Sequence, residues 1–307
     1  MGTEETAKHW LGKLVKLNPA SGRGECRGKA PHKPLFLLCL LEMAEAGELT
    51  SRTFVCSPGL VLRFRSYGSL VNSRWPTRLD FRLPFFHLNT QGFWESFDAE
   101  IRVARSSETC VVCELHKDFF DLLVDPGFRL KARIVLVTKY FSEDEQIAFF
   151  EIFGIHGDFS SKDRRTQLTK EAEESAKRKG RSAQFSVRVC TNYRFTCALT
   201  GYKCMTGNGA TIVDAAHIEQ WAKTQNDDPT NGLALSKNAH WMFDNGLWSA
   251  DDHLRIVVNS RNFTEHGPDT FRLSSFSGRH LQFDPSCSLR PSLESLKRHR
   301  LRFGILF

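Results

Sequence analysis

The chain has 307 residues, of which 41% are hydrophobic and 25% charged, and its formal net charge is +7. This length predicts one large or two medium-sized domains, and the composition is that of a folded chain rather than a disordered one. No apolar run reaches the ~20 residues of a membrane-spanning helix, and the acidic N-terminus predicts no secretory signal. The irregular spacing of nine cysteines indicates reduced thiols and a cytoplasmic location.

The first half of the chain predicts mainly helices. Residues 31–48 form a dense apolar run that favours a buried helix, with Pro34 in its first turn and Gly47 at its end. Residues 60–66 fit either the end of a helix or a short strand. Residues 143–153 predict a short amphipathic helix.

Two segments of this half predict β structure instead. Residues 81–88 and 93–95 fit the strands of a hairpin, joined by the turn-type sequence Asn89-Thr90-Gln91-Gly92. Residues 133–140 alternate in polarity and contain β-branched side chains, which is typical of a strand.

A polar, charged stretch at residues 160–182 predicts a domain boundary, with a part at 170–179 that favours helix. The elements expected after it are a short strand ending in a turn at 197–201, a strand at 210–218, a loop at 231–235 that leads to a helix at 237–243, and strands at 247–248 and 254–258. Strands followed by a helix are the arrangement that a ββα metal site requires.

Basic residues gather in four places, which favours a polyanionic partner because each neutralised phosphate releases counterions. Each cluster alone fits a solvated surface, but four clusters beside apolar segments favour nucleic acid. The clusters are residues 1–34, residues 62–82 with Arg63, Arg65, Arg74, Arg78 and Arg82, residues 160–188, and Lys297-Arg298-His299-Arg300.

Three polar residues of the second half share one strand–loop–helix frame. They lie in Asp214-Ala215-Ala216-His217-Ile218, in Asn231-Gly232-Leu233-Ala234-Leu235 and in His240-Trp241-Met242-Phe243-Asp244-Asn245-Gly246-Leu247. His217, Asn231 and His240 follow one another at intervals of 14 and 9 residues. Over residues 189–258 this pattern resembles the HNH nuclease motif, in the Ala-Ala-His-Ile form of modification-dependent restriction endonucleases.

The resemblance implies hydrolysis of a DNA phosphodiester, in which water is deprotonated and the added negative charge is neutralised. His217 would be the base, since a neutral imidazole with a reference pKa of ~6.5 accepts a proton near pH 7. Asn231 would brace the loop or the metal shell, and its amide or a backbone carbonyl would orient the His217 ring. His240 would bind a divalent ion that supplies Lewis acidity.

Two carboxylates are expected to complete the metal set. Asp244 lies four residues after His240 on the same helix face, and Asp214 lies three residues before His217. Many HNH nucleases have an acidic residue directly before the first histidine, where this chain has Ala216. Mg²⁺ or Mn²⁺ suits one histidine with carboxylate oxygens, and Zn²⁺ or Ni²⁺ fits the same mixture.

Two further patterns have simple structural interpretations. Asp244-Asn245-Gly246 also fits a helix cap with Gly246 in the left-handed conformation. Cys110-x-x-Cys113 is a lone pair, so no structural zinc is expected, and most cysteines are interpreted as small buried apolar side chains.

A second resemblance lies in the first half of the chain. His32-Lys33-Pro34-Leu35-Phe36-Leu37-Leu38, Leu83-Pro84-Phe85-Phe86-His87-Leu88 and Gly92-Phe93-Trp94-Glu95 are similar to the sulfur-binding domain of phosphorothioate-dependent HNH restriction endonucleases. The resemblance implies that His32 and Lys33 contact the DNA backbone and that Pro84 lines an apolar cavity for sulfur. Leu83 stands where that family has Tyr, and His87 where it has Ala.

The DNA-binding residues expected from this resemblance and from the basic clusters are Arg23, Arg27, His32, Lys33, Leu83, Pro84, His87, Arg102 and Arg105. Sulfur is larger and less hydrated than oxygen, so an apolar cavity accepts it but deprives an oxygen anion of its water. The competing interpretation takes residues 84–86 as the start of a core strand and His32 as a surface residue.

The sequence therefore predicts an α+β protein with a modified-DNA recognition domain at 1–159, a basic helical linker at 160–184 and an HNH (ββα-metal) endonuclease domain at 185–307. The predicted function is a metal-dependent endonuclease of bacterial defence that cuts double-stranded DNA near a modification, foremost a phosphorothioate. The alternatives are reading of methylated or hydroxymethylated bases, or a non-catalytic DNA-binding protein with a decayed HNH frame. A homodimer is compatible with cutting both strands.

Overall fold

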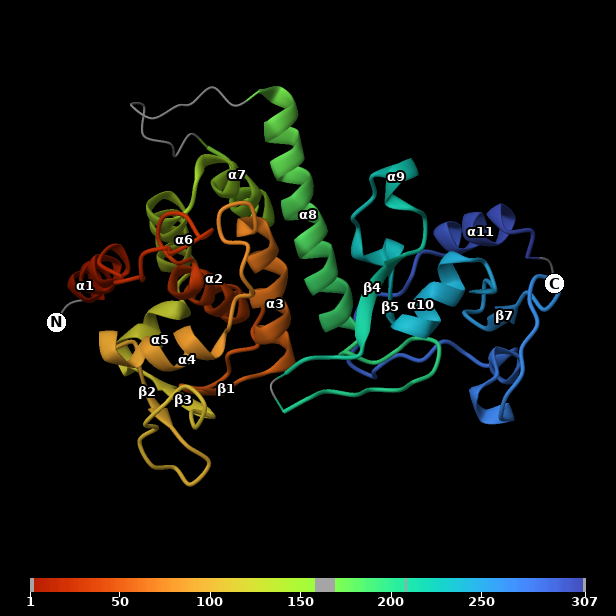
Figure 1. Ribbon diagram of the computed structural model, residues 1–307, viewed down its shortest axis with the longest axis horizontal. Coiled ribbons are helices and arrows are strands. Elements are labelled where there is room, and N and C mark those ends of the chain that lie inside the picture. Colours follow the sequence, from red (N-terminus) through yellow and green to blue (C-terminus); the bar gives the residue numbers. More distant parts are fainter. Residues whose placement is uncertain (1–2, 158–168, 208, 306–307) are drawn as a thin grey trace. The chain divides into compact units, whose positions relative to one another are not determined.

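A computed structural model describes residues 3–157, 169–207 and 209–305. The chain divides into two compact units, residues 1–183 and 184–307 (Figure 1). The division falls within one long helix, α8 (Lys170–Asn192). The predicted linker is thus helical from residue 170 onward, and its residues 160–168 lie outside the described part. Within the described ranges, no helix is both long and apolar enough to cross a membrane.

The first unit packs its helices around α2 (His32–Glu45). Residues 35–41 of α2 are each at most 1% exposed, as expected of a helix that is apolar on every face. Beside it, strands pair antiparallel in the order β1–β3–β2. The other elements are α1 (Thr3–Val15), β1 (Thr53–Val55), α3 (Pro58–Gly68), α4 (Arg82–His87), β2 (Trp94–Phe97), β3 (Val112–Leu115), α5 (Lys117–Leu123), α6 (Pro126–Tyr140) and α7 (Glu143–Ile152).

The predicted hairpin over residues 81–95 is wrong. Its first half is helix α4, because Phe81 and Phe85 lie one helical turn apart and are both buried in that conformation. Its second half is strand β2, which contains Trp94 and pairs with β3. The connection is a 3-10 helix, η2 (Asn89–Gln91), which ends at Gly92 with a φ of +70°.

The predicted strand over residues 133–140 is also wrong, because this segment is the second half of helix α6. Asp125 caps the helix by accepting hydrogen bonds from the backbone N–H groups two and three residues on, at 2.9 and 3.1 Å. Phe128, Ala132 and Leu136 follow at a spacing of four and are buried. The helical period therefore outweighs the β-branched composition.

The other helices predicted for this unit are confirmed. Residues 31–48 contain α2, with Pro34 in its first turn, and the ambiguous segment 60–66 lies inside helix α3. Helix α7 begins at its expected first residue, because Ser142 and Glu145 form a capping box there.

The second unit is built on a strand pair followed directly by a helix (Figure 1). Strand β4 (Val213–His217) pairs antiparallel with β5 (Gly232–Ser236), and α10 (Lys237–Asp244) comes next. The strand expected at 210–218 and the helix at 237–243 are confirmed. The remaining elements are α9 (Trp221–Thr224), β6 (Trp248–Ala250), β7 (Ile256–Val258) and α11 (Leu293–Arg302).

Two predictions for this unit need correction. Residues 231–235, expected as a loop, mostly belong to strand β5, because four of its five residues are buried and pair with β4. Residues 197–201, expected to end a strand, form a turn whose Ala198 N–H donates to the Ala234 carbonyl at 2.8 Å. The mixed helix and strand content and the order of elements confirm the α+β class.

Candidate active site

His217 ends strand β4, opposite Gly232 at the start of β5. A Cβ added to Gly232 would collide with the side chains of Val189 and Phe185, so only glycine lets α8 approach this closely. The same approach stacks the Phe185 ring on the His217 ring, at 3.8 Å between centroids and 7° between planes. The histidine side chain remains 22% exposed, so one part of the ring is still open to solvent.

Asp227, which the sequence analysis did not identify, sets the orientation of the His217 ring within its plane. The His217 Nε2 atom lies 3.0 Å from Asp227 Oδ1. The second oxygen of the carboxylate accepts a hydrogen bond from Trp221 Nε1 at 3.0 Å. Within the residues that the structure describes, His217 Nδ1 has no hydrogen-bond partner, so the arrangement favours a proton on Nε2 and a free lone pair on Nδ1.

Asn231 is fully buried and braces the loop between β4 and β5. Its Oδ1 accepts from the Glu219 N–H at 2.9 Å, and its Nδ2 donates to the carbonyls of Asn226 (3.0 Å) and Glu219 (3.2 Å). These bonds hold the segment that presents Asp227. Asn231 thus makes the loop-bracing contacts that were one of its two expected roles, while Asp227 provides the side-chain contact that orients the His217 ring.

His240 and Asp244 lie one turn apart on α10, with His240 Nε2 3.3 Å from Asp244 Oδ2. Their side chains are 26% and 50% exposed, so both are accessible to solvent and to a substrate. Gly246 follows with a φ of +68°, the left-handed conformation that its position after the helix predicts. The segment after α10 therefore ends the helix as expected, and Asp244 also pairs with His240.

Asp214 is separated from this pair. It lies near the start of β4 and forms an ion pair with Lys237. Among residues 3–157, 169–207 and 209–305, no three His, Cys, Asp or Glu side chains gather as they would around one ion. His240 and Asp244 still provide one imidazole nitrogen and one carboxylate oxygen, a donor mixture that suits a divalent ion retaining water ligands.

The pair expected to head the DNA-contacting helix is half-buried. His32 begins α2 and lies edge-on to the Trp75 ring, at 5.9 Å between centroids. Burial lowers the pKa of His32, and the nearby carboxylate of Asp80 opposes that shift. Burial likewise lowers the pKa of Lys33, whose Nζ donates to the Asn18 carbonyl at 3.0 Å. Part of each side chain remains accessible.

The residues expected to form a sulfur cavity are on α4. Pro84 is buried, whereas Leu83 is 40% exposed and His87 is exposed. The exposed residues of this short helix are therefore Arg82, Leu83 and His87. Phe85 is buried beneath them, and its carbonyl accepts from Trp94 Nε1 at 2.9 Å.

Two of the basic clusters contribute less surface charge than their composition suggests. In residues 62–82, Arg63 is 2% exposed and pairs with Glu48 at 2.7 Å, and Arg74 pairs with a buried glutamate at 2.7 Å. In the C-terminal cluster, His299 and Arg300 are 3% and 5% exposed. These residues stabilise the fold, so they are not available to bind a polyanion.

The arginines expected to bind DNA differ in whether they form ion pairs within the protein. Arg102 forms ion pairs with Asp98 at 3.2 Å and with Glu100 at 2.8 Å. The remaining arginines of that prediction are exposed: Arg23, Arg27 and Arg105.

Seven of the nine cysteines are buried, which confirms their interpretation as small apolar side chains.

Comparison with known proteins identifies the second unit's motif. Residues 197–251 match the HNH endonuclease family. Among solved structures, the chain is similar to a "Modification dependent TagI restriction endonuclease", with 22% sequence identity and a TM-score of 0.31. That match covers 39% of this chain and 37% of the other, so the chain spans less than two fifths of that protein's length. No curated protein matches the chain.

The matched segment contains the whole of β4, β5 and α10, and with them His217, Asp227, Asn231 and His240. The segment that matches the HNH endonuclease family thus contains the histidine that is paired with a carboxylate. Residues 197–251 form an HNH endonuclease domain.

Proposed function

We propose that the chain is a metal-dependent DNA endonuclease of bacterial defence, in which the second unit hydrolyses phosphodiester bonds and the first selects modified double-stranded DNA. The observation that carries this proposal is the His217–Asp227 pair at the end of β4, inside the HNH domain. A decayed HNH frame would not need a carboxylate held in place for its histidine. The fully buried Asn231 that braces the same loop supports an intact site as well.

In this proposal His217 is the general base. Its Nδ1 takes a proton from the attacking water, while its Nε2–H stays hydrogen-bonded to Asp227. The carboxylate then stabilises the imidazolium that forms, and stacking on Phe185 keeps the ring plane fixed. A positioned base of this kind contributes about 10²–10⁴-fold to the rate.

His240 and Asp244 are the residues that would hold the divalent ion. When bound, the ion supplies Lewis acidity and neutralises the charge that develops on the phosphate. Mg²⁺ or Mn²⁺ is the proposed ion, and Zn²⁺ or Ni²⁺ fits the same donors. Asp214 is left out of this set because Lys237 neutralises it.

For the first unit we propose that the modification read is a backbone phosphorothioate. The support is the similarity of the segments around His32, Pro84 and Trp94 to sulfur-binding domains, and the exposed apolar side chain of Leu83 on α4. An apolar contact at the non-bridging atom favours sulfur, because the oxygen anion loses more hydration there. Arg23, Arg27 and Arg105, which are exposed, would hold neighbouring phosphates.

The test is cleavage of three otherwise identical plasmids, carrying phosphorothioate linkages, methylated cytosines or no modification, each with Mg²⁺ or Mn²⁺ and with a chelator. We expect cutting of the phosphorothioated plasmid only, and only when a divalent ion is present. Linear product that rises with the square of protein concentration would indicate that two copies act together.

The matched control variants are His217→Ala, which removes the proposed base, and His253→Ala, which removes an exposed histidine of the same unit. His253→Ala should cut as the wild type does, whereas His217→Ala should cut about 10²–10⁴-fold more slowly. Equal cutting by wild type and His217→Ala would refute the catalytic centre. Equal cutting of all three plasmids would refute modification reading and leave the nuclease assignment intact.

A further inference from the structure

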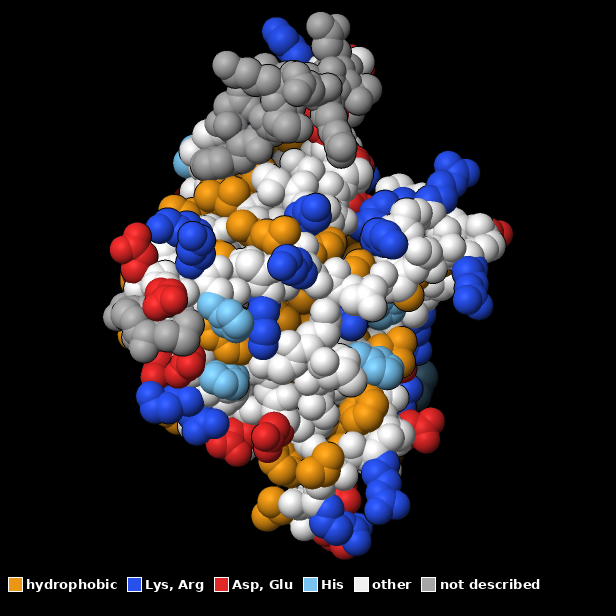
Figure 2. All heavy atoms as spheres, turned by 90° about the vertical axis from the view of Figure 1, so that its left-hand side faces the viewer, with side chains coloured by type: hydrophobic (Ala, Val, Ile, Leu, Met, Phe, Trp, Pro, Cys, Tyr) orange, Lys and Arg blue, Asp and Glu red, His pale blue; other side chains and the backbone are white. Residues whose placement is uncertain are grey.

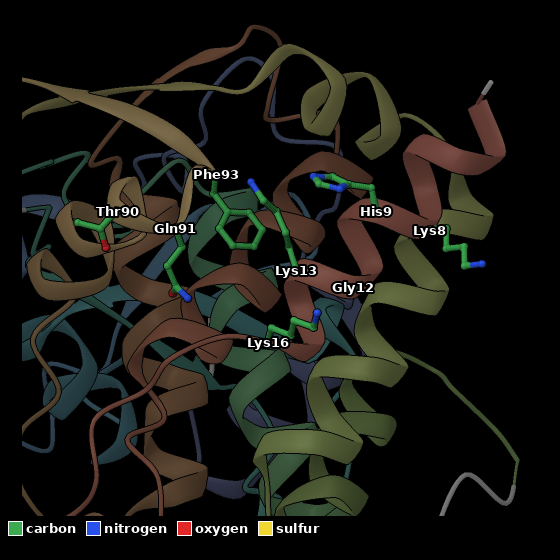
Figure 3. A pocket seen from close by; sticks show the side chains of 8 residues that line it. All are labelled: Lys8, His9, Gly12, Lys13, Lys16, Thr90, Gln91 and Phe93. Carbon is green, nitrogen blue, oxygen red and sulfur yellow. The ribbon is translucent and has the colours of Figure 1, made fainter. Parts of the chain in front are cut away.

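A cationic groove lies on the first unit, between helix α1 and the η2 connection that follows α4 (Figure 3). Its volume is about 530 Å³, and no acidic side chain lines it. The lining residues are Lys8, His9, Gly12, Lys13, Lys16, Thr90, Gln91 and Phe93. None of them is among the individual residues predicted to bind DNA, although Lys8, Lys13 and Lys16 belong to the basic cluster of residues 1–34.

The periodicity of α1 places these cations on one side of the helix. His9, Gly12, Lys13 and Lys16 follow at steps of three and four residues, which is one face of an α-helix. Lys8 and Lys16 are exposed at the two ends of the groove and form no ion pair within the described ranges. Lys8, Lys13 and Lys16 thus make this face positive, while the acidic residues of α1, Glu4 and Glu5, lie in its first turn.

Lys13 is the most constrained of these cations. Its Nζ lies 4.4 Å from the centroid of the Trp10 ring and 3.4 Å from the Gly92 carbonyl that accepts its hydrogen bond. Burial lowers its pKa, and no carboxylate is within ion-pairing distance among the described residues. An anion in the groove would supply the opposite charge that the ammonium lacks.

One neutral residue of the groove, Gly12, also suits a ligand. A Cβ added to Gly12 would meet no atom within 4 Å, so packing does not require glycine there, although glycine destabilises a helix interior. The bare backbone instead leaves room for close approach.

We propose that this groove binds the sugar–phosphate backbone of duplex DNA, as a contact surface separate from the residues expected to read the modification. This inference rests on the proposed function. Lys8 and Lys16 are eight residues apart, roughly 12 Å along the helix, which spans more than one phosphate of a strand and so favours a polyanion over a single phosphate. Figure 2 shows Lys, Arg and His side chains across the middle of the face that contains α1, with acidic side chains mainly toward its margins.

The experiment measures binding of an unmodified duplex between 50 and 200 mM salt, in the His217→Ala background so that no DNA is cut. Removing two phosphate contacts should make the slope of log affinity against log salt shallower by about 1.8 and cost on the order of a hundredfold in affinity at 50 mM salt. The test variant is Lys8→Ala/Lys16→Ala. The control, Lys131→Ala/Lys139→Ala, removes two exposed lysines at the same spacing on α6.

A second variant separates binding from folding. Gly12→Ala should raise the midpoint of thermal unfolding by about 2–4 °C and yet lower the affinity for the duplex, because the new methyl group occupies the groove. Unchanged DNA affinity in Gly12→Ala, or equal salt slopes for the test and control double variants, would overturn the proposal. So would displacement of the duplex by inorganic phosphate at constant ionic strength, because the site would then be one for a single anion.

Failure of this inference and of the proposed function are distinguishable. Unchanged salt slopes with intact cleavage by the wild type would refute the groove alone. A shallower slope together with no cleavage of any substrate would refute the nuclease and support the groove. If the wild type binds no duplex at all, both proposals fail.

Discussion

Two histidines of the second unit are stacked on phenylalanine rings in nearly the same way, one at the end of β4 and one in α11. His217 lies on Phe185 at 3.8 Å with 7° between planes, and His299 lies on Phe243 at 3.9 Å with 6° between planes. The rings differ in what their nitrogens contact and in how far solvent reaches them. That difference decides which of them can do chemistry.

His299 is 3% exposed, and both of its nitrogens have partners. Nδ1 lies 3.1 Å from the Ser249 hydroxyl, and Nε2 lies 3.1 Å from the Phe243 carbonyl. Burial lowers the pKa of His299 to about 4, so it is neutral at physiological pH. His217 instead faces a carboxylate with one nitrogen and is partly exposed. The stacking on phenylalanine is thus common to both histidines. Their hydrogen-bond partners and their exposure decide whether the ring only stabilises the fold or is available for proton transfer.

Exchanging the two histidines for alanine should give the largest contrast. We expect His217→Ala to lower the cleavage rate by about 10²–10⁴-fold and to cost less stability than His299→Ala, because the His217 side chain is 22% exposed. His299→Ala should leave the cleavage rate unchanged and lower stability by about 2–4 kcal/mol, because it creates a cavity and leaves two hydrogen-bonding groups without their partner. Initial cleavage rates and unfolding curves test both, and a His217→Ala variant that is destabilised as much as His299→Ala would contradict the comparison.

The next effect concerns acid stability. The pKa of His299 is about 4 in the folded chain and ~6.5 when unfolded, so between these values the unfolded state binds a proton that the folded state does not. Stability from this group is therefore complete above pH 6.5 and falls as the pH drops toward 4, by about 3 kcal/mol in total. Denaturant unfolding at pH 7, 6, 5 and 4.5 measures this slope.

The control is His299→Asn, which retains a hydrogen-bonding side chain but does not titrate. Its stability should be lower than that of the wild type at pH 7, and the gap should narrow as the pH falls. A gap that stays constant over this range would show that the protonation of His299 is not linked to unfolding.

A smaller effect is expected at the carboxylate beside the other histidine. Asp227→Asn preserves the shape of the contact but removes the charge that stabilises the imidazolium, and its amide can donate to Nε2 and invert the tautomer of His217. We expect cleavage to slow by about 10- to 100-fold, less than in His217→Ala, with the pH dependence of the rate shifted. The rate profile between pH 5 and 9 measures both. A rate equal to that of wild type would show that Asp227 does not position the base.

Three residues of the candidate site could be picked out from the sequence, because their spacing matches a known motif. His217, Asn231 and His240 were recognisable because each lies at a definite place in a strand–loop–helix frame. Asp227 was not, since its contact depends on how the loop after β4 folds back, and Asp227-Asp228 offers two equivalent carboxylates to a reader of the sequence. The structure separates them, because Asp228 caps the 3-10 turn η4 (Pro229–Asn231) and Asp227 faces the histidine.

Surface charge was the less predictable quantity. A run of basic residues does not reveal its partners when those lie far away in the chain, as with Arg74 and Glu145, which are 71 residues apart. The same holds for Arg300, which pairs with Asp252 at 2.6 Å. Among the residues that the structure describes, the lysines of α1 form no ion pair, because the residues that face them across the groove are neutral. Helix α6 differs from the predicted strand because the β-branched residues of its second half favour a strand when taken alone, whereas its N-terminal cap, Asp125, lies eight residues before that segment.

The smallest effects should come from two single hydrogen bonds, one to the carboxylate that contacts His217 and one to the ring of His299. Trp221→Phe removes the hydrogen bond to Asp227 Oδ2, which is worth about 1 kcal/mol and should slow cleavage by about 2- to 10-fold with little change in stability. Ser249→Ala removes the hydroxyl beside His299 Nδ1 and should lower stability by about 1 kcal/mol while leaving cleavage unchanged. Measured together, the variants separate the two stacks even where each effect is small. If Ser249→Ala slowed cleavage as much as Trp221→Phe, the buried stack would be coupled to the active site and the division between them would be wrong.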